Sequence, residues 1–231
     1  MVVAATKTRV FLHRNMREAA QRGAVRAAAP NMLKVHRRPF APGLLAALLV
    51  HDFGTGRHVA RLKDLPALVE AGLRRVRSPL VNHASGGVMP RGPGRFDVAL
   101  AAVVTTHPAA RAIENLACAH ARRLRLTRPP ITRLHLMIVQ PGATAQPWHC
   151  DGGARSGRGY ATLIVPLTRD PRGSGTEFRG AGSPGGTVLL GEFGGAYCFD
   201  GGVAHRGSAH AGSAPRLFMF AVLCAGEDPN A

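Results

Sequence analysis

Cysteines, acidic residues and aromatic residues are all scarce in this 231-residue sequence, and so are long apolar runs. The four cysteines are scattered and form no Cys-x-x-Cys pair, which excludes a disulfide-stapled scaffold and a cysteine-based structural zinc site. The longest apolar runs, at 44–50 and 98–104, are far shorter than the about 20 residues of a membrane helix. We therefore expect an intracellular protein, cytoplasmic or organellar, that has no membrane span.

The shortage of acidic residues leaves a strongly basic chain, with 13 Asp and Glu against 30 Lys and Arg and a formal charge of +17. Such an excess is typical of proteins that bind nucleic acid or another polyanion. It equally fits a coding sequence rich in GC, because Ala, Gly, Pro and Arg are all abundant. One Trp and two Tyr are few for stacking bases, which counts against a nucleic-acid groove.

The chain divides by pattern into three regions. Residues 1–40 are rich in Arg and contain the single acid Glu18, which is typical of an organellar transit peptide or of a basic arm. Residues 41–130 are predicted to be helical support: one amphipathic helix from Asp64 to about 77, then helices at 96–104 and 109–126. Between these helices, 82–94 is rich in Gly and Pro and predicts a loop.

From residue 131 to 227 the pattern changes to short apolar runs separated by Gly, Pro and Ser. This pattern predicts strands that form two facing sheets, a jelly roll whose mouth can hold a ligand. The fold class is thus α+β, a double-stranded β-helix of the jelly-roll or cupin-like kind with N-terminal buttressing helices. The predicted strands lie at 132–140, 146–150, 160–168, 175–178, 187–190, 195–199 and 216–224.

The strongest chemical signal is His149-Cys-Asp151 on one of these strands. Side chains two apart on an extended segment point to the same side. If the fold brings His205 beside them, the set is two imidazoles and a carboxylate, the facial triad that binds Fe(II). A lone His-x-Asp also occurs in ordinary surface turns, and His210 competes with His205 for the distal position.

The order of segments around this triplet resembles the 2-oxoglutarate- and Fe(II)-dependent dioxygenases, in particular their prolyl-4-hydroxylase-like branch. The resemblance covers about 131–224, and it includes the Gly175-Thr-Glu-Phe segment and Phe199-Asp200 before His205. It implies Fe(II) on His149, Asp151 and His205, with 2-oxoglutarate as cosubstrate and O2 as oxidant.

The resemblance also implies a basic residue that clamps the distal carboxylate of 2-oxoglutarate. Arg216 is predicted to fill this role, because a guanidinium offers a planar fork and a permanent charge. The rival Arg206 would point away from the metal if His205 points toward it. Relatives often have Tyr or Asn on the strand before the His-x-Asp, where this sequence has Met137 and Val139, and often Tyr at the position of Pro166. Thr162 is therefore predicted as a replacement hydroxyl partner.

The implied reaction is hydroxylation of a protein side chain or a small molecule, with succinate and CO2 as coproducts. Two alternatives remain open from the sequence: oxidative demethylation of nucleic acid, which the charge motivates, and a non-catalytic jelly-roll binding module. An intact carboxylate at Asp151 argues against the second alternative. Trp148, beside the triplet, is predicted to pack in the core.

Overall fold

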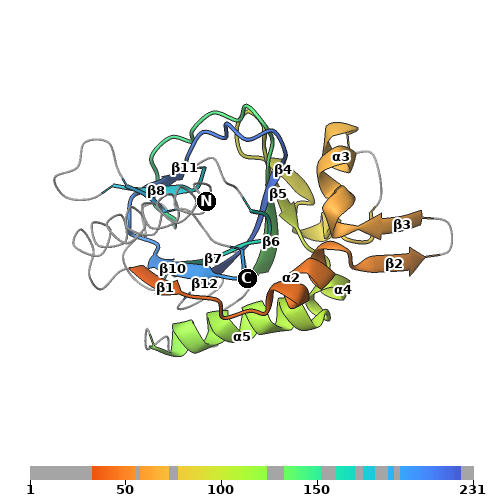
Figure 1. Ribbon diagram of the computed structural model, residues 1–231, viewed down its shortest axis with the longest axis horizontal. Coiled ribbons are helices and arrows are strands. Elements are labelled where there is room, and N and C mark those ends of the chain that lie inside the picture. Colours follow the sequence, from red (N-terminus) through yellow and green to blue (C-terminus); the bar gives the residue numbers. More distant parts are fainter. Residues whose placement is uncertain are drawn as a thin grey trace, which may run out of the picture.

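The structure is a computed structural model, and it describes residues 33–55, 58–72, 78–123, 133–151, 160–169, 174–179, 187–189 and 193–224. Helices and antiparallel strands are mixed in it, and the strands form sheets of seven, three and two strands (Figure 1). Within the described residues, no helix is both long and apolar enough to cross a membrane.

The seven-stranded sheet organises the molecule, and all of its neighbouring strands are antiparallel. Along its central strands, the side chains on both faces of the sheet are mostly apolar and buried. This pattern is typical of a sheet that is covered on both sides. Its strands, in spatial order, are β1 (Leu33–His36), β10 (Ala196–Asp200), β7 (Tyr160–Pro166), β12 (Arg216–Cys224), β6 (Arg133–Val139), β5 (Arg95–Ala99) and β4 (Val88–Pro90).

Helices cover one face of this sheet, which we call the outer face. The longest, α5 (Pro108–Arg123), packs against β7 and β12, and α2 (Pro42–Leu49) packs against α5 (Figure 1). Pro108 suits the first turn of a helix, and His107 Nδ1 accepts a hydrogen bond from the Ala109 amide at 3.1 Å. Two short helices, α3 (Leu65–Glu70) and α4 (Ala102–Thr105), complete the described helical part.

A smaller sheet packs over the opposite, inner face. It consists of β11 (His205–Gly207), β8 (Thr176–Phe178) and β9 (Thr187–Leu189), and in Figure 1 β8 and β11 lie across from β7 and β10. The Phe178 ring of β8 lies 5.1 Å from the Phe199 ring of β10, centroid to centroid. A separate hairpin of β2 (Asp52–Thr55) and β3 (His58–Arg61) stands to one side of the sheets.

The predicted mixture of helices and antiparallel strands is confirmed. Five predicted strand ranges contain β6, β7, β8, β9 and β12, and the range 195–199 matches β10 except for its last residue, Asp200. The helix predicted at 96–104 is wrong in its first half. Residues Arg95–Ala99 form β5, because pairing with β4 and β6 outweighs a local pattern that fits either structure. The strand predicted at 146–150 is reduced to an isolated bridge at His149.

The regional division at residues 40 and 130 remains a prediction, but the large sheet crosses both boundaries. Strand β1 lies inside the segment 1–40 and pairs with β10, and β5 lies inside the region predicted to be helical. Residues 1–32, which make up most of the basic N-terminal segment and of the predicted transit peptide, lie outside the described residues. The helix predicted from Asp64 to about 77 begins after Asp64 as α3, and Asp64 makes no side-chain capping bond. The predicted length is wrong, because the helix ends at Glu70 and the next two residues form a turn in which Gly72 has a φ of 89°. Residues 73–77 lie outside the described residues.

Candidate metal centre

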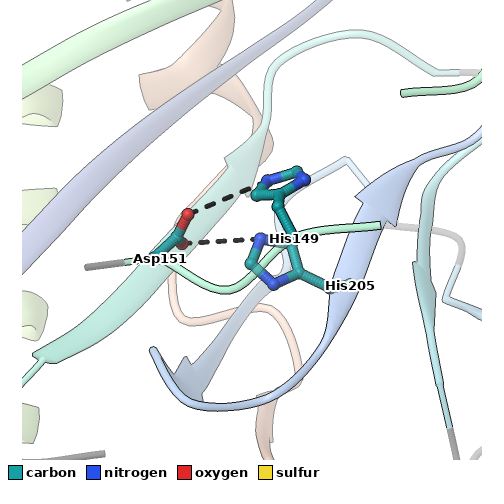
Figure 2. Close-up of side chains that lie close together, drawn as sticks. All are labelled: His149, Asp151 and His205. Carbon is teal, nitrogen blue, oxygen red and sulfur yellow. Dashed lines mark ion pairs between the residues drawn. The ribbon is translucent and has the colours of Figure 1, made fainter. Parts of the chain in front are cut away.

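Three side chains with metal-ligand chemistry meet at the inner face of the large sheet: His149, Asp151 and His205 (Figure 2). His149 and His205 come together because their backbones form an isolated antiparallel bridge, with N–O distances of 3.0 and 2.9 Å. His149 Nε2 lies 3.9 Å from Asp151 Oδ1, and His205 Nε2 lies 3.5 Å from Asp151 Oδ2. The grouping expected from the sequence is therefore present.

Hydrogen bonds orient both imidazoles. His149 Nδ1 donates to the Pro147 carbonyl at 3.0 Å, and His205 Nδ1 donates to the Val203 carbonyl at 2.8 Å. These bonds fix the tautomer, so each Nε2 carries a lone pair on the side of Asp151. The Thr162 hydroxyl donates to Asp151 Oδ2, which holds the carboxylate in place.

Burial differs between the two histidines. His205 is 7% exposed and packs against the ring of Phe199, whereas His149 is 40% exposed. Burial lowers the pKa of His205, and this outweighs the Asp151 carboxylate, which acts to raise it. The His205 ring is therefore neutral at neutral pH, the state in which an imidazole can bind a metal.

The donor set fits a divalent metal ion of the Fe(II) kind. Two ligand atoms that are each about 2.1 Å from one ion lie at most about 4.2 Å apart, which the two His–Asp distances of 3.5 and 3.9 Å satisfy. All three ligand atoms lie within 4.8 Å of one another, so a small closure of the group brings them to one ion. Two imidazoles and one carboxylate without thiolate are the ligands of an open facial site. His210, the rival for the distal position, is not in the group, because its ring is bonded to the Ser174 hydroxyl and the Ala214 carbonyl, both at 2.8 Å.

A small pocket adjoins the three residues on the same face of the sheet. Ile164 lines it and is two residues from Thr162 on β7, so both side chains point inward. The buried Arg216 supplies its charge, with Nη1 3.3 Å from the Gly175 carbonyl and the guanidinium 4.8 Å above the Phe218 ring. The pocket is lined by Ile164, Pro166, Thr168, Ser174, Tyr197, Arg216 and Phe218.

Tyr197 is a polar residue of this pocket that the sequence interpretation missed. Its hydroxyl lies 2.8 Å from Thr176 Oγ1, and burial raises the pKa of the phenol, which therefore stays protonated and able to donate. Alternation with the buried Phe199 could have placed Tyr197 on the inner face. A guanidinium and a phenol hydroxyl with apolar walls suit a carboxylate.

Three further residues can be compared with their predictions. Thr162 lies beside Asp151 and does not line the Arg216 pocket, so its predicted contact with the cosubstrate stays a prediction. Arg206 points away from the centre, as expected, and pairs with Glu177 at 2.7 Å. The prediction that Trp148 packs in the core is wrong, because its ring is only half-buried and lies 4.5 Å from the Arg206 guanidinium.

No protein-family model and no curated protein sequence matches this chain. Among solved structures, a Pseudomonas putida prolyl-4-hydroxylase is similar with a TM-score of 0.52 and 15% identity over 90% of this chain and 100% of that chain. HygX from Streptomyces hygroscopicus, solved with nickel and 2-oxoglutarate, has a TM-score of 0.53 and 9% identity over 88% of this chain and 86% of that chain. The epimerase SnoN, solved with Fe3+, alpha-ketoglutarate and nogalamycin RO, has a TM-score of 0.51 and 15% identity over 89% of this chain and 84% of that chain. The chain thus shares the fold of 2-oxoglutarate- and iron-dependent oxygenases, as the resemblance in its sequence implied.

Proposed function

We propose that this chain is an Fe(II)- and 2-oxoglutarate-dependent dioxygenase that hydroxylates a small molecule or a protein side chain. The observation that carries the proposal is that His149, Asp151 and His205 gather over the inner face of the large sheet, the face from which Arg216 and its pocket also open. Structural neighbours that contain nickel or iron together with 2-oxoglutarate support it. We also propose that the two packed sheets form a double-stranded β-helix, buttressed by α2 and α5.

In this proposal His149 and His205 bind Fe(II) through Nε2, and Asp151 binds it through a carboxylate oxygen. When bound, the iron and 2-oxoglutarate together supply the oxidation by O2, with succinate and CO2 as coproducts. Thr162 holds Asp151 through its hydrogen bond, so the carboxylate need not reorganise on binding. The carbonyls of Pro147 and Val203 hold the two imidazoles in the same way.

Arg216 binds the distal carboxylate of 2-oxoglutarate. The pocket is small and its charged residue is buried, so a carboxylate inside it loses water and depends on the guanidinium for compensation. Tyr197 is a second donor to the same carboxylate. The rings of Phe178 and Phe199 lie 6.2 and 4.6 Å from the His205 ring, centroid to centroid, and help to keep water from that ligand.

Hydroxylation is proposed over other outcomes of the same chemistry, which include epimerisation in SnoN. The similarity to the prolyl-4-hydroxylase extends over the whole length of that protein, which supports this choice. The substrate itself is sought by experiment, with peptides, small metabolites and oligonucleotides offered in parallel.

The test measures Fe(II)-dependent conversion of 2-oxoglutarate to succinate in the presence of each substrate class. We expect stimulation by a peptide or small molecule, and loss of all turnover in Asp151→Ala and His205→Ala. His210→Asn is the matched control, since it alters a buried imidazole outside the group and should keep Fe(II) binding. Wild-type protein that binds neither Fe(II) nor Mn(II) would contradict the proposal, and stimulation only by oligonucleotides would favour demethylation of nucleic acid.

A further inference from the structure

Arg95 is a buried arginine with an unusual set of partners. It lies on β5 in a row that runs Arg216, Val139, Arg95 across three strands, so it points to the inner face. In the part of the chain that the structure describes, its guanidinium pairs with no carboxylate. Burying a guanidinium without a carboxylate partner lowers the stability of the fold. We therefore expect Arg95 to have a role that offsets this cost.

Among the described residues, the partners of the guanidinium are all backbone carbonyls, and these carbonyls belong to two segments. Nε and Nη2 donate to the Thr144 carbonyl at 3.1 and 2.9 Å. Nη2 also lies 3.4 Å from the Gly207 carbonyl and donates to that of Ser208. Thr144 precedes the segment that carries His149 and Asp151, whereas Gly207 and Ser208 directly follow His205. One side chain therefore joins the two segments that provide the three candidate metal ligands.

Gly207 shows how closely this junction is packed. A Cβ built on Gly207 would lie 2.8 Å from Arg95 Nη1 and 2.7 Å from Gln146 Oε1. Gln146 Oε1 accepts a hydrogen bond from the Gly207 amide at 2.9 Å, and the Gln146 amide donates to the Gly207 carbonyl at 2.9 Å. Backbone bonds also join the two segments on either side of this junction: the His149–His205 bridge lies on one side, and on the other the Gly142 amide donates to the His210 carbonyl and the His210 amide to the Ala143 carbonyl. The Arg95 bonds lie between these two pairings, where the described residues form no regular ladder.

We infer that Arg95 is a positioning residue of the metal centre: its planar fork sets the spacing between the segment of His149 and Asp151 and the segment of His205. This inference rests on the proposed function, because it assigns a role toward the metal. Burial and the neighbouring charge of Arg216 lower the pKa of Arg95 to about 10, so the guanidinium stays charged and donates from every nitrogen at neutral pH. A lysine has the charge but lacks the fork.

The experiment measures the Mn(II) affinity of the full-length protein, by electron paramagnetic resonance of free Mn(II), together with thermal unfolding. Arg95→Met should weaken Mn(II) binding by about 10- to 100-fold, the usual loss when a residue that supports metal ligands is removed. Arg95→Lys should fall between Arg95→Met and wild type. The matched control is Arg91→Met, which removes two hydrogen bonds to the buried Asp97, and should lower stability with wild-type Mn(II) affinity.

Folded Arg95→Met with wild-type Mn(II) affinity would overturn the inference and leave the proposed function intact. An equal loss of affinity in Arg91→Met would also overturn it, since the effect would then follow stability alone. If Arg95→Met does not fold, Arg95→Lys decides: weaker binding supports the positioning role, and wild-type binding rejects it. Wild-type protein without Mn(II) affinity would refute the proposed function and this inference together.

Discussion

Replacing Arg216 by Ala is the sharpest test of the anion pocket. The side chain is 7% exposed, so a 2-oxoglutarate carboxylate bound beside it is largely removed from water. Truncating one partner of a buried charge pair costs about 2–5 kcal/mol. Because the Tyr197 hydroxyl remains as a second donor, we expect about 3 kcal/mol, which corresponds to a loss of roughly 150-fold in 2-oxoglutarate affinity.

The assay is calorimetric titration of 2-oxoglutarate into Mn(II)-loaded protein, in which binding is measured without turnover. Arg216→Lys has the charge but not the fork, so it should lose roughly tenfold in affinity. Arg206→Ala is the matched control, because Arg206 pairs with Glu177 on the side away from the centre and should bind 2-oxoglutarate like wild type. Arg216→Ala that binds within threefold of wild type would refute the assignment of the pocket.

Three further outcomes are expected. Tyr197→Phe should weaken 2-oxoglutarate binding by up to about tenfold in the same titration, the worth of one hydrogen bond, and unchanged affinity would remove Tyr197 from the pocket. The pKa of Asp97 is lowered by His135 and Arg91 against the opposing effect of burial, so its stabilisation is present above about pH 4 and is lost as the pH falls below that value. Asp97→Asn should thus cost about 3 kcal/mol in urea unfolding at pH 7, with the difference from wild type shrinking below pH 4. Removing residues 1–32 should preserve Mn(II) binding, whereas removing 1–41 also deletes β1, exposes the edge of β10 and should lower the melting temperature.

The parts of the site that the sequence predicted are those specified by local order. His149 and Asp151 share a side because an extended backbone alternates, and His205 follows the end of a strand that is itself apolar and alternating. The inward direction of His205 also determined that Arg206 points outward, where it meets Glu177. The relations of Asp151 to His149 and of Arg206 to His205 depend on neighbours in the chain, so periodicity is enough to find them. The choice of His205 as the third residue rested on the resemblance to a known family.

The parts that were missed depend on pairing between distant segments. The residues of β5 read as a helix from their own pattern, and only the β4 and β6 partners make them a strand. Arg95 gains its partners from segments about 50 and 110 positions further along the chain, a separation at which no spacing rule applies. Trp148 was expected in the core because of its size, but the guanidiniums of Arg179 and Arg206 lie over its ring instead.

The isolated bridge between His149 and His205 has a consequence for stability. The chain between these two residues contributes β7, β8, β9 and β10, so it includes strands of both packed sheets. An ion bound by both imidazoles would close this stretch into a ring, as a covalent cross-link would, and the loop-closure entropy of a long ring is large. Metal would then act as a removable staple: a chelator should loosen the small sheet first, and hydrogen exchange at the amides of β8 and β11 should accelerate before that of β6 and β12.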